Sequence, residues 1–255
     1  MREYTVPSQV AYLDQVAAIS HGRDYKRRLL EALDPRPGQV ALDLGCGPGT
    51  DLAALADAVG DDGHVLGVDN DPVMVSLAAE RTRDRPTIEV RAGDAHALPV
   101  NDGSVDRARA DRVLQHLEDP CQALAELRRV LRAGGIVGLC EPDWDTLVID
   151  DASPELGQAL AGFIGTRVRN RAIGRQLPRL CTSVGLDLST VDATAVVLRD
   201  PAMAEVVLGL RRNVVRAVRA GALPDAGADG LLERLAAGPM LASFVVWTVT
   251  ATRRQ

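Results

Sequence analysis

The sequence of 255 residues is long enough for one α/β domain with an added segment, and its 46% apolar and 25% charged residues are ordinary for a globular protein. This composition excludes an intrinsically disordered, collagen-like or coiled-coil chain. The formal net charge of −6 argues against a general nucleic-acid-binding protein.

The chain begins with a segment that predicts two helices. Apolar residues recur at helical spacings between Tyr4 and Leu33, and the pattern is interrupted near His21 and Gly22. The breaker cluster Asp34-Pro35-Arg36-Pro37-Gly38 ends this segment. We therefore assign residues 1–37 to N-terminal cap helices and residues 38–255 to the main domain.

Predicted strands and helices alternate in the next part of the chain. Short apolar runs predict strands at residues 40–44, 65–68, 87–91, 105–110 and 136–140. The intervening helices are predicted from a cap at Thr50, from Asp71 followed by Pro72, and from a helical face that ends at Gly134 and Gly135. This alternation predicts a parallel sheet with helices on both faces and with ligands at the carboxyl ends of the strands.

The last hundred residues depart from this alternation. A helix is predicted from Ser153-Pro154-Glu155, and strands are predicted at residues 191–198 and 244–250. Because no crossover helix of standard length separates these two strands, we expect an antiparallel pair at the sheet edge, with residues 202–237 inserted between them as helices. The main domain then divides into residues 38–150 and residues 151–255.

A glycine-rich loop follows the first predicted strand, with the sequence Asp43-Leu44-Gly45-Cys46-Gly47-Pro48-Gly49-Thr50. Glycines two residues apart let the backbone approach a ligand closely, and the helix that follows offers N–H groups at its N-terminus. Asp69 ends the second strand, where a carboxylate accepts hydrogen bonds from both ribose hydroxyls. The pattern indicates a nucleoside site.

The loop also indicates which nucleoside fits. Dinucleotide sites favour GxGxxG, whereas this loop has GxGxG preceded by the acidic Asp43. A carboxylate at that place repels pyrophosphate and attracts an ammonium or sulfonium group. A nicotinamide-dependent oxidoreductase is therefore the weaker interpretation.

The loop resembles motif I of the class I S-adenosylmethionine-dependent methyltransferases. Four further segments resemble the family's later motifs in the same order, namely residues 65–70, 93–99, 105–120 and 127–135. The resemblance covers residues 38–142 and implies S-adenosylmethionine as cofactor and S-adenosylhomocysteine as product. It implies an open, doubly wound, mostly parallel seven-stranded sheet with an antiparallel edge strand, and it makes residues 38–150 the cofactor-binding half and residues 151–255 the acceptor-side half.

The resemblance implies a role for each cofactor residue. The backbone of the glycine loop lies along the methionine moiety, Asp43 holds its ammonium group, and Asp69 accepts the ribose hydroxyls. Adenine is flanked by Asn70 and Met74 and is bound by Asp94 and the Ala95 N–H, while Ala110 and Asp111 face the methionine end. The full set is Asp43, Gly45, Cys46, Gly47, Gly49, Asp69, Asn70, Met74, Asp94, Ala95, Ala110 and Asp111. Ordinary turn carboxylates, and a packing role for Met74, are the alternatives.

The acceptor side has fewer candidates. His116 follows the fourth strand and is the candidate general base, with a helix-capping or backbone-bonding role as the alternative. Tyr12, Glu141, Asp143 and Trp144 are predicted to line the acceptor pocket. Trp144 either stacks on a flat substrate or covers the edge of the core, and Tyr12 and His21 are candidates to close over the cofactor.

Two arginine-rich stretches and the inserted helices complete the pattern. The arginines at 167, 169, 171 and 175 and at 211, 212, 216 and 219 are more often solvated helix faces than anion sites. If either stretch binds a ligand, the acceptor carries a carboxylate or a phosphate. The inserted helices have more apolar residues than a single core-facing stripe of an amphipathic helix requires. This excess predicts a substrate lid or a homodimer face.

We predict a methyltransferase that acts on a small organic acceptor such as a natural product, by O-, N- or C-methylation. The alternatives are an enzyme of the same fold that catalyses a cyclisation or decarboxylation, a nicotinamide-dependent oxidoreductase, and a non-catalytic cofactor-binding protein. The four cysteines are far apart and predict neither a disulfide framework nor a metal site. With no leader and no apolar run of membrane-spanning length, we expect a cytoplasmic protein without nucleic-acid or membrane partners.

Overall fold

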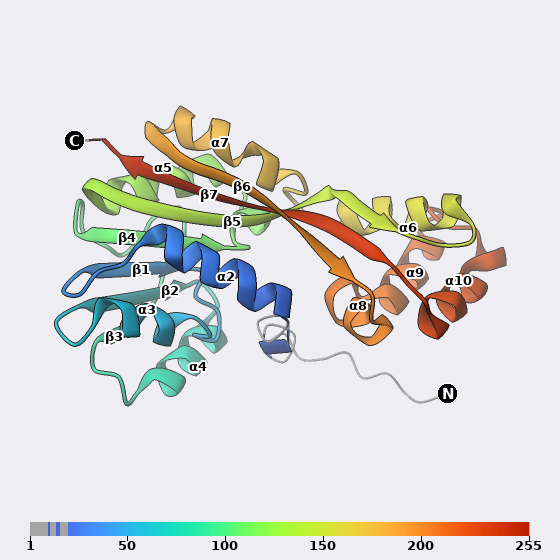
Figure 1. Cartoon of the computed structure of the whole chain (residues 1–255), viewed down its shortest axis with the longest axis horizontal. Coiled ribbons are helices and arrows are strands. Elements are labelled where there is room, and N and C mark those ends of the chain that lie inside the picture. The colour runs from blue at the N-terminus through green and yellow to red at the C-terminus, as the bar shows by residue number, and fades with distance from the viewer. Residues whose placement is uncertain (1–9, 11–13, 16–19, 255) are drawn as a thin grey trace.

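The computed structural model describes residues 10, 14–15 and 20–254, with the backbone alone at residues 20–23. Its strands form one sheet in the order β3-β2-β1-β4-β5-β7-β6. The first five strands in this order run parallel, whereas β7 runs antiparallel to both β5 and β6 (Figure 1). The expected open, mostly parallel seven-stranded sheet with an antiparallel edge is confirmed.

The elements have the following bounds. The strands are β1 (Val40–Leu44), β2 (His64–Asp69), β3 (Ile88–Ala92), β4 (Val105–Asp111), β5 (Leu131–Ile149), β6 (Leu186–Leu198) and β7 (Ala242–Arg253). The helices are α2 (Ser20–Leu33), α3 (Leu52–Val59), α4 (Pro72–Thr82), the 3-10 turn η1 (Leu114–His116), α5 (Pro120–Val130), α6 (Pro154–Thr166), α7 (Ile173–Ser183), α8 (Pro201–Leu208), α9 (Leu210–Arg219) and α10 (Asp225–Ala237). None of these described helices is both long and apolar enough to pass through a bilayer.

The central strands are buried on both faces. Alternate side chains of a strand point to opposite faces, and in β1 Ala41 packs with α3 and α4, whereas Leu42 and Leu44 pack with α5 and α7. Strands buried on both faces consist of nearly continuous apolar residues. For this reason the short apolar runs in the sequence predicted where these strands lie.

Aspartates cap two of the crossover helices. Asp71 accepts a hydrogen bond from the Val73 N–H at 2.9 Å, and Asp119 accepts one from the Gln122 N–H at 3.0 Å; a proline follows each cap. The predicted cap at Thr50 is wrong: Asp51 stands at the N-cap of α3, and its side chain makes no capping hydrogen bond. The Asp51 carboxylate turns instead toward charged groups of α2 and β4.

The end of α5 and the extent of β5 also differ from the prediction. The helix ends at Val130 rather than at Gly134 and Gly135, and β5 begins directly at Leu131. Gly134 has a φ of +76° and lies where the register between β4 and β5 shifts, so this glycine serves the strand and not the helix end. The strand extends to Ile149, well beyond its predicted end at Cys140.

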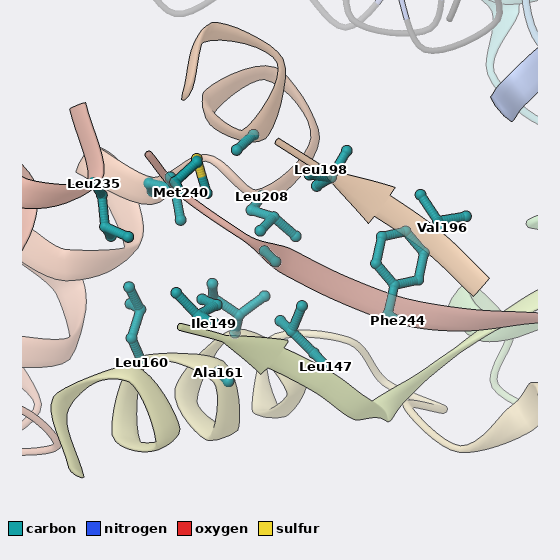
Figure 2. Packing of buried hydrophobic residues seen from close by; sticks show 14 of the residues in the cluster. Leu147, Ile149, Leu160, Ala161, Val196, Leu198, Leu208, Leu235, Met240 and Phe244 are labelled. Carbon is teal, nitrogen blue, oxygen red and sulfur yellow. The ribbon is translucent and has the colours of Figure 1, made fainter. Parts of the chain in front are cut away.

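The far ends of β5, β6 and β7 continue beyond the other strands and carry a second core. Figure 1 shows α6, α8, α9 and α10 gathered around these ends. Figure 2 shows the buried contacts between side chains of the three strands and of the helices, among them Leu147, Leu160, Val196, Leu208, Leu235 and Phe244. As expected, the segment between β6 and β7 is helical.

One helix of the predicted N-terminal pair is described. α2 packs on β5 through Leu29 and Leu33, which are fully buried. A Cβ at Gly138 of β5 would lie 2.7 Å from Leu29 Cδ1 and 3.0 Å from Leu33 Cγ, so only glycine permits this close approach. Most of the segment expected to form the first helix, including Tyr12, lies outside the described residues.

Candidate functional site

A cavity of about 940 Å³ opens at the carboxyl ends of β1, β2, β4 and β5. Ligands of open α/β sheets bind at this end of the strands. The cavity extends from the glycine loop and Asp69 past His116 to the helices α6, α8 and α9. It therefore connects the polar residues at the strand ends to the apolar residues of the second core.

The glycine loop between β1 and α3 has the backbone that the sequence predicted. Gly45, Gly47 and Gly49 have φ values of +68°, +53° and +81°, which side chains rarely permit. A Cβ at Gly45 would lie 2.4 Å from Val113 Cγ2. The loop can therefore lie against the β4 end only with glycine at this position.

The N–H groups of this loop are already used within the protein. Gly45 and Cys46 donate to the Val68 carbonyl oxygen at 2.7 and 3.1 Å, Gly47 donates to Asp69 Oδ2 at 2.8 Å, and Gly49 donates to the Cys46 carbonyl oxygen at 3.1 Å. The sequence predicted free N–H groups at the N-terminus of the following helix, and these four loop N–H groups add none to them. An anionic group in the cavity therefore finds no free donor among these four N–H groups.

Asp69 lies at the end of β2 with its carboxylate fixed. Oδ2 accepts the Gly47 N–H at 2.8 Å and Oδ1 accepts the Asp71 N–H at 2.9 Å. Each carboxylate oxygen has two lone pairs and retains one for a further donor. The carboxylate lines the cavity, where it is held ready for a pair of hydroxyl groups.

The predicted adenine residues lie together along one side of the cavity. Asn70, Met74, Asp94 and Ala95 all line it, and Met74 is 3% exposed. Asp94 accepts hydrogen bonds from the backbone and the ring of His96 at 2.9 and 2.8 Å. Both of these hydrogen bonds use Oδ1, and Asp94 Oδ2 makes none with His96.

A buried cluster of charges lies beneath the glycine loop. Arg109 of β4 faces Asp43 across the β1–β4 pair, with Nε 3.3 Å from Asp43 Oδ1, and its Nη2 lies 3.1 Å from Asp51 Oδ2 and 3.3 Å from Asp111 Oδ2. Lys26 of α2 forms an ion pair with Asp51 and lies 3.5 Å from Asp111. The cluster ties α2 to the cavity floor.

Burial raises the pKa of two acidic groups of this region, whereas at Asp51 burial is outweighed by Arg109 and Lys26, which lower its pKa. Burial raises the pKa of Asp43 to about 6, although Arg109 stabilises the charged carboxylate. Burial and the neighbouring Asp111 carboxylate raise the pKa of Tyr25, which donates to Asp111 at 3.4 Å. Asp111 Oδ1 is buried and accepts no hydrogen bond from any residue in the described part of the chain. A cationic donor in the cavity would complete it.

His116 ends the turn η1, and three hydrogen bonds hold this turn. Asn170 donates through Nδ2 to the Leu114 and Leu117 carbonyl oxygens at 2.8 and 2.7 Å, and its N–H donates to the Gln115 carbonyl oxygen at 3.0 Å. Burial and the nearby Arg112 guanidinium lower the pKa of His116. The imidazole is therefore neutral at pH 7 and able to accept a proton.

Trp144 lies beside this turn and faces the cavity. Its Nε1 donates to Gln115 Oε1 at 2.8 Å, and its ring stacks on Phe244 with centroids 5.0 Å apart and planes at 22°. The register between β5 and β7 shifts between Asp143 and Val148, and within this irregular stretch the Trp144 N–H donates to the Arg171 carbonyl oxygen at 2.7 Å. Trp144 thus packs against the second core and also lines the cavity, while its stacking on a flat substrate stays a prediction.

The structure does not bring Glu141 and Asp143 to the cavity. Both are fully buried, and neither lines it. Glu141 Oε1 accepts the N–H groups of Val113 and Leu114 at 2.8 and 2.6 Å, and burial raises its pKa to about 8. Asp143 pairs with Arg175. Gly49 and Ala110 also lie outside the lining, and Tyr12 lies outside the described residues.

Lys26, Tyr25 and Arg109 line the cavity, and the sequence reasoning missed all three. Arg109 carried one signal, since an arginine in the middle of a strand buried on both faces requires acidic partners. Lys26 carried no such signal. The pattern of an amphipathic helix does not show which of its charged residues will face the cavity near Asp43, 17 residues further along the chain. Within the described residues, no group of three or more possible metal ligands lies together.

Comparison with known sequences gives a family and two informative relatives. Residues 42–139 match the model of the methyltransferase domain family. An uncharacterized 37.1 kDa protein in transposon Tn4556 of Streptomyces fradiae is 51% identical over 250 residues, which are 98% of this chain and 72% of that protein. The demethylmenaquinone methyltransferase of Staphylococcus aureus is 32% identical over 137 residues, which are 54% of this chain and 57% of that enzyme. The chain thus spans little more than half of the latter's length.

Solved structures share the fold over nearly the whole chain. A SAM-dependent methyltransferase from Aquifex aeolicus has a TM-score of 0.60 at 16% identity and covers 98% of this chain and 100% of its own. Geranyl diphosphate C-methyltransferase from Streptomyces coelicolor, in complex with S-adenosyl-L-homocysteine, has a TM-score of 0.57 at 17% identity over 98% and 87%. The [4+2]-cyclase SpnF has a TM-score of 0.59 at 20% identity over 91% and 81%. At these identities the likeness concerns the fold alone.

Proposed function

The chain belongs to the class I S-adenosylmethionine-dependent methyltransferases, and we propose that it methylates a small organic acceptor that binds in the apolar part of the cavity. S-adenosylmethionine is its cofactor. The observation that carries the proposal is the single cavity that joins the glycine loop and Asp69 to the ring of Trp144. Donor and acceptor can therefore meet in one space, aligned and shielded from water.

The charged cluster supports a place for the methionine end of the cofactor. The buried Asp43 suits an ammonium group, as does Asp111 Oδ1, which accepts no hydrogen bond from the described residues and has Arg112 Nε 3.7 Å away. The N–H groups of Gly45, Cys46, Gly47 and Gly49 are occupied, and Lys26, which lines the cavity, is the cation we assign to the carboxylate. The residues present therefore fit a zwitterionic amino-acid moiety at this end.

Asp69 is the residue we assign to the ribose hydroxyls, with Asn70, Met74, Asp94 and Ala95 around the adenine. Asp69→Ala is expected to weaken S-adenosylmethionine binding by roughly 1–3 kcal/mol, because two hydroxyl donors lose their acceptor. Isothermal titration calorimetry measures this, with the exposed Asp84→Ala as the matched control. An Asp69→Ala protein with wild-type affinity would remove the ribose assignment.

For the transfer step, the protein has to orient the acceptor and to provide a group that accepts a proton from it. S-adenosylmethionine, when bound, supplies an already activated methyl group. The Trp144 ring and the turn η1, held by Asn170, form the walls between which an acceptor is oriented. We assign to the neutral His116 the removal of a proton from a hydroxyl or ammonium acceptor.

The overall proposal is tested first by titration with S-adenosylmethionine, S-adenosylhomocysteine and NAD. Micromolar binding of the two sulfur nucleosides and none of NAD is expected. An acceptor screen then follows S-adenosylhomocysteine release, and His116→Gln is expected to reduce turnover at unchanged cofactor affinity. Full activity of His116→Gln across the pH range would remove it as the base.

A non-methylating reaction on the same scaffold is the second candidate. The fold shared with the [4+2]-cyclase SpnF is compatible with it. The two candidates differ in one product, since only methyl transfer releases S-adenosylhomocysteine. Conversion of an acceptor without this product would replace the first proposal by the second.

A further inference from the structure

We propose that the acceptor is an organic anion with an apolar body, whose carboxylate or phosphate is bound by arginines from two separate segments at the cavity mouth. This inference rests on the proposed function and names the class of its acceptor. The arginines are Arg167 and Arg169, between α6 and α7, and Arg212 and Arg216 of α9.

The four arginines converge on the cavity from places far apart in the chain. Arg212 and Arg216 are one helical turn apart and so lie on the same face of α9. Arg167 ends α6, and Arg169 follows it in the connection to α7. All four line the cavity and are exposed, so guanidinium groups from two separate segments lie at its mouth.

These arginines lack the carboxylate partners that their neighbours have. Arg171 lies 2.8 Å from Asp145 and Arg175 pairs with Asp143, whereas no carboxylate of the described residues lies within 4.0 Å of the four. Glu205 lies within electrostatic reach of Arg212, whose charge opposes the rise in pKa that burial causes at Glu205, but it makes no ion pair with Arg212. Four like charges at one opening of a protein with net charge −6 form a local positive field that attracts an anion.

The interior of the same cavity is apolar next to these charges. Trp144 and Phe244 form a stacked pair, and Val196, Leu198, Val207 and Val246 continue the wall. An acceptor with an apolar body buries that body here while its charged group stays with the arginines. A planar guanidinium binds carboxylate and phosphate oxygens in pairs, which fixes the orientation of the acceptor toward His116.

The charges along the cavity differ in whether they are paired. Beneath the glycine loop, Asp43, Asp51 and Asp111 lie against Arg109 and Lys26, whereas the four arginines have no carboxylate of the described residues within 4.0 Å. A cationic acceptor would be repelled at the mouth, and a neutral acceptor would leave the guanidinium groups unused. The anion is therefore the class that the charges select.

The experiment uses three probes with the same ten-carbon body, namely decanoate, decyl phosphate and decanol, below their aggregation concentrations. Each is titrated into the full chain saturated with S-adenosylhomocysteine, and binding is followed by isothermal titration calorimetry. We expect both anions to bind at least tenfold more tightly than decanol, with an advantage that falls as NaCl is raised. A stronger effect with decyl phosphate identifies a phosphorylated acceptor, and a stronger effect with decanoate identifies a carboxylated one.

Matched double variants assign the effect to the proposed arginines. In Arg212→Gln/Arg216→Gln the anion preference should fall to less than threefold, while the control Arg211→Gln/Arg219→Gln, on the same helix but outside the cavity lining, should keep it. Equal binding of decanol and the anions by the wild-type chain, or a preference that survives the first variant, overturns the inference. Because saturation with S-adenosylhomocysteine is measured first, failure at that step overturns the proposed function instead.

Discussion

Asp43→Asn is expected to make the protein more stable and less able to bind its cofactor. Asp43 is buried beneath the glycine loop, and its pKa is raised from an ordinary 3.8 to about 6 chiefly because burial penalises its charge. Its ionisation therefore opposes folding even though Arg109 lies 3.3 Å away. Asparagine keeps the shape of the side chain and removes the charge.

The magnitude follows from the two pKa values. A carboxylate whose pKa is higher in the folded state binds its proton more tightly there, so its contribution to stability is complete below pH 3.8 and is lost as the pH rises through 6. The difference between 3.8 and about 6 corresponds to about 3 kcal/mol at pH 8. Asp43→Asn should recover at most this free energy of unfolding at pH 8, and only about 1 kcal/mol near pH 4.5.

Urea denaturation of the ligand-free protein at pH 8 and pH 4.5 measures the stability difference, and calorimetry measures cofactor binding. The variant should lose about 1.5–3 kcal/mol of S-adenosylmethionine affinity, the usual scale for a hydrogen bond between charged groups. Asp84→Asn, whose side chain is 90% exposed, is the control and should show neither effect. An Asp43→Asn protein that is less stable than wild type at pH 8, or equally stabilised at both pH values, would refute the reasoning.

Three further predictions concern other parts of the molecule. Gly138→Val should destabilise the protein by about 1–3 kcal/mol in urea denaturation, because its Cβ meets Leu29 at 2.7 Å, whereas Gly162→Ala, with open space around it, should not. Asn170→Leu should lower turnover without changing S-adenosylhomocysteine affinity, since it frees the turn that holds His116; an unchanged turnover would refute that role. Lys26 is the sole lysine of the chain, so its acylation, followed by peptide mass spectrometry, should be slowed by S-adenosylmethionine if it binds the cofactor.

The cofactor half of the site could be predicted because its signals are local. The glycines that need positive φ, the carboxylate that ends β2 and the turn residues that follow β3 each lie within a few residues of a strand end. A parallel sheet brings all strand ends to one edge, so their order along the chain suffices to place them together. The positions of Asp69 and Asp94 beside the same cavity agree with this reasoning.

The remaining features depend on contacts that no local pattern contains. Glu141 and Asp143 follow the expected end of a strand, but β5 continues past them, so both are enclosed between neighbouring strands and helices. The arginine-rich stretches look uniform in the sequence, yet Arg171 and Arg175 find acidic partners on β5 while Arg167 and Arg169 face the cavity. A helical periodicity cannot distinguish these outcomes, because they depend on which element lies opposite.

The insertion between β6 and β7 leaves and re-enters the sheet at paired residues, since Leu198 lies opposite Ala242. A segment with adjacent ends can be replaced by a longer or shorter one without shifting the register of the strands that carry it. Recombination at these two points would exchange α8, α9 and α10, and with them Arg212 and Arg216, while the glycine loop and Asp69 stay untouched. In this architecture, exchange of the single segment that contains α8, α9 and α10 can change the choice of acceptor. The same two junctions allow chimeras to be built that keep the cofactor and change the molecule that is modified.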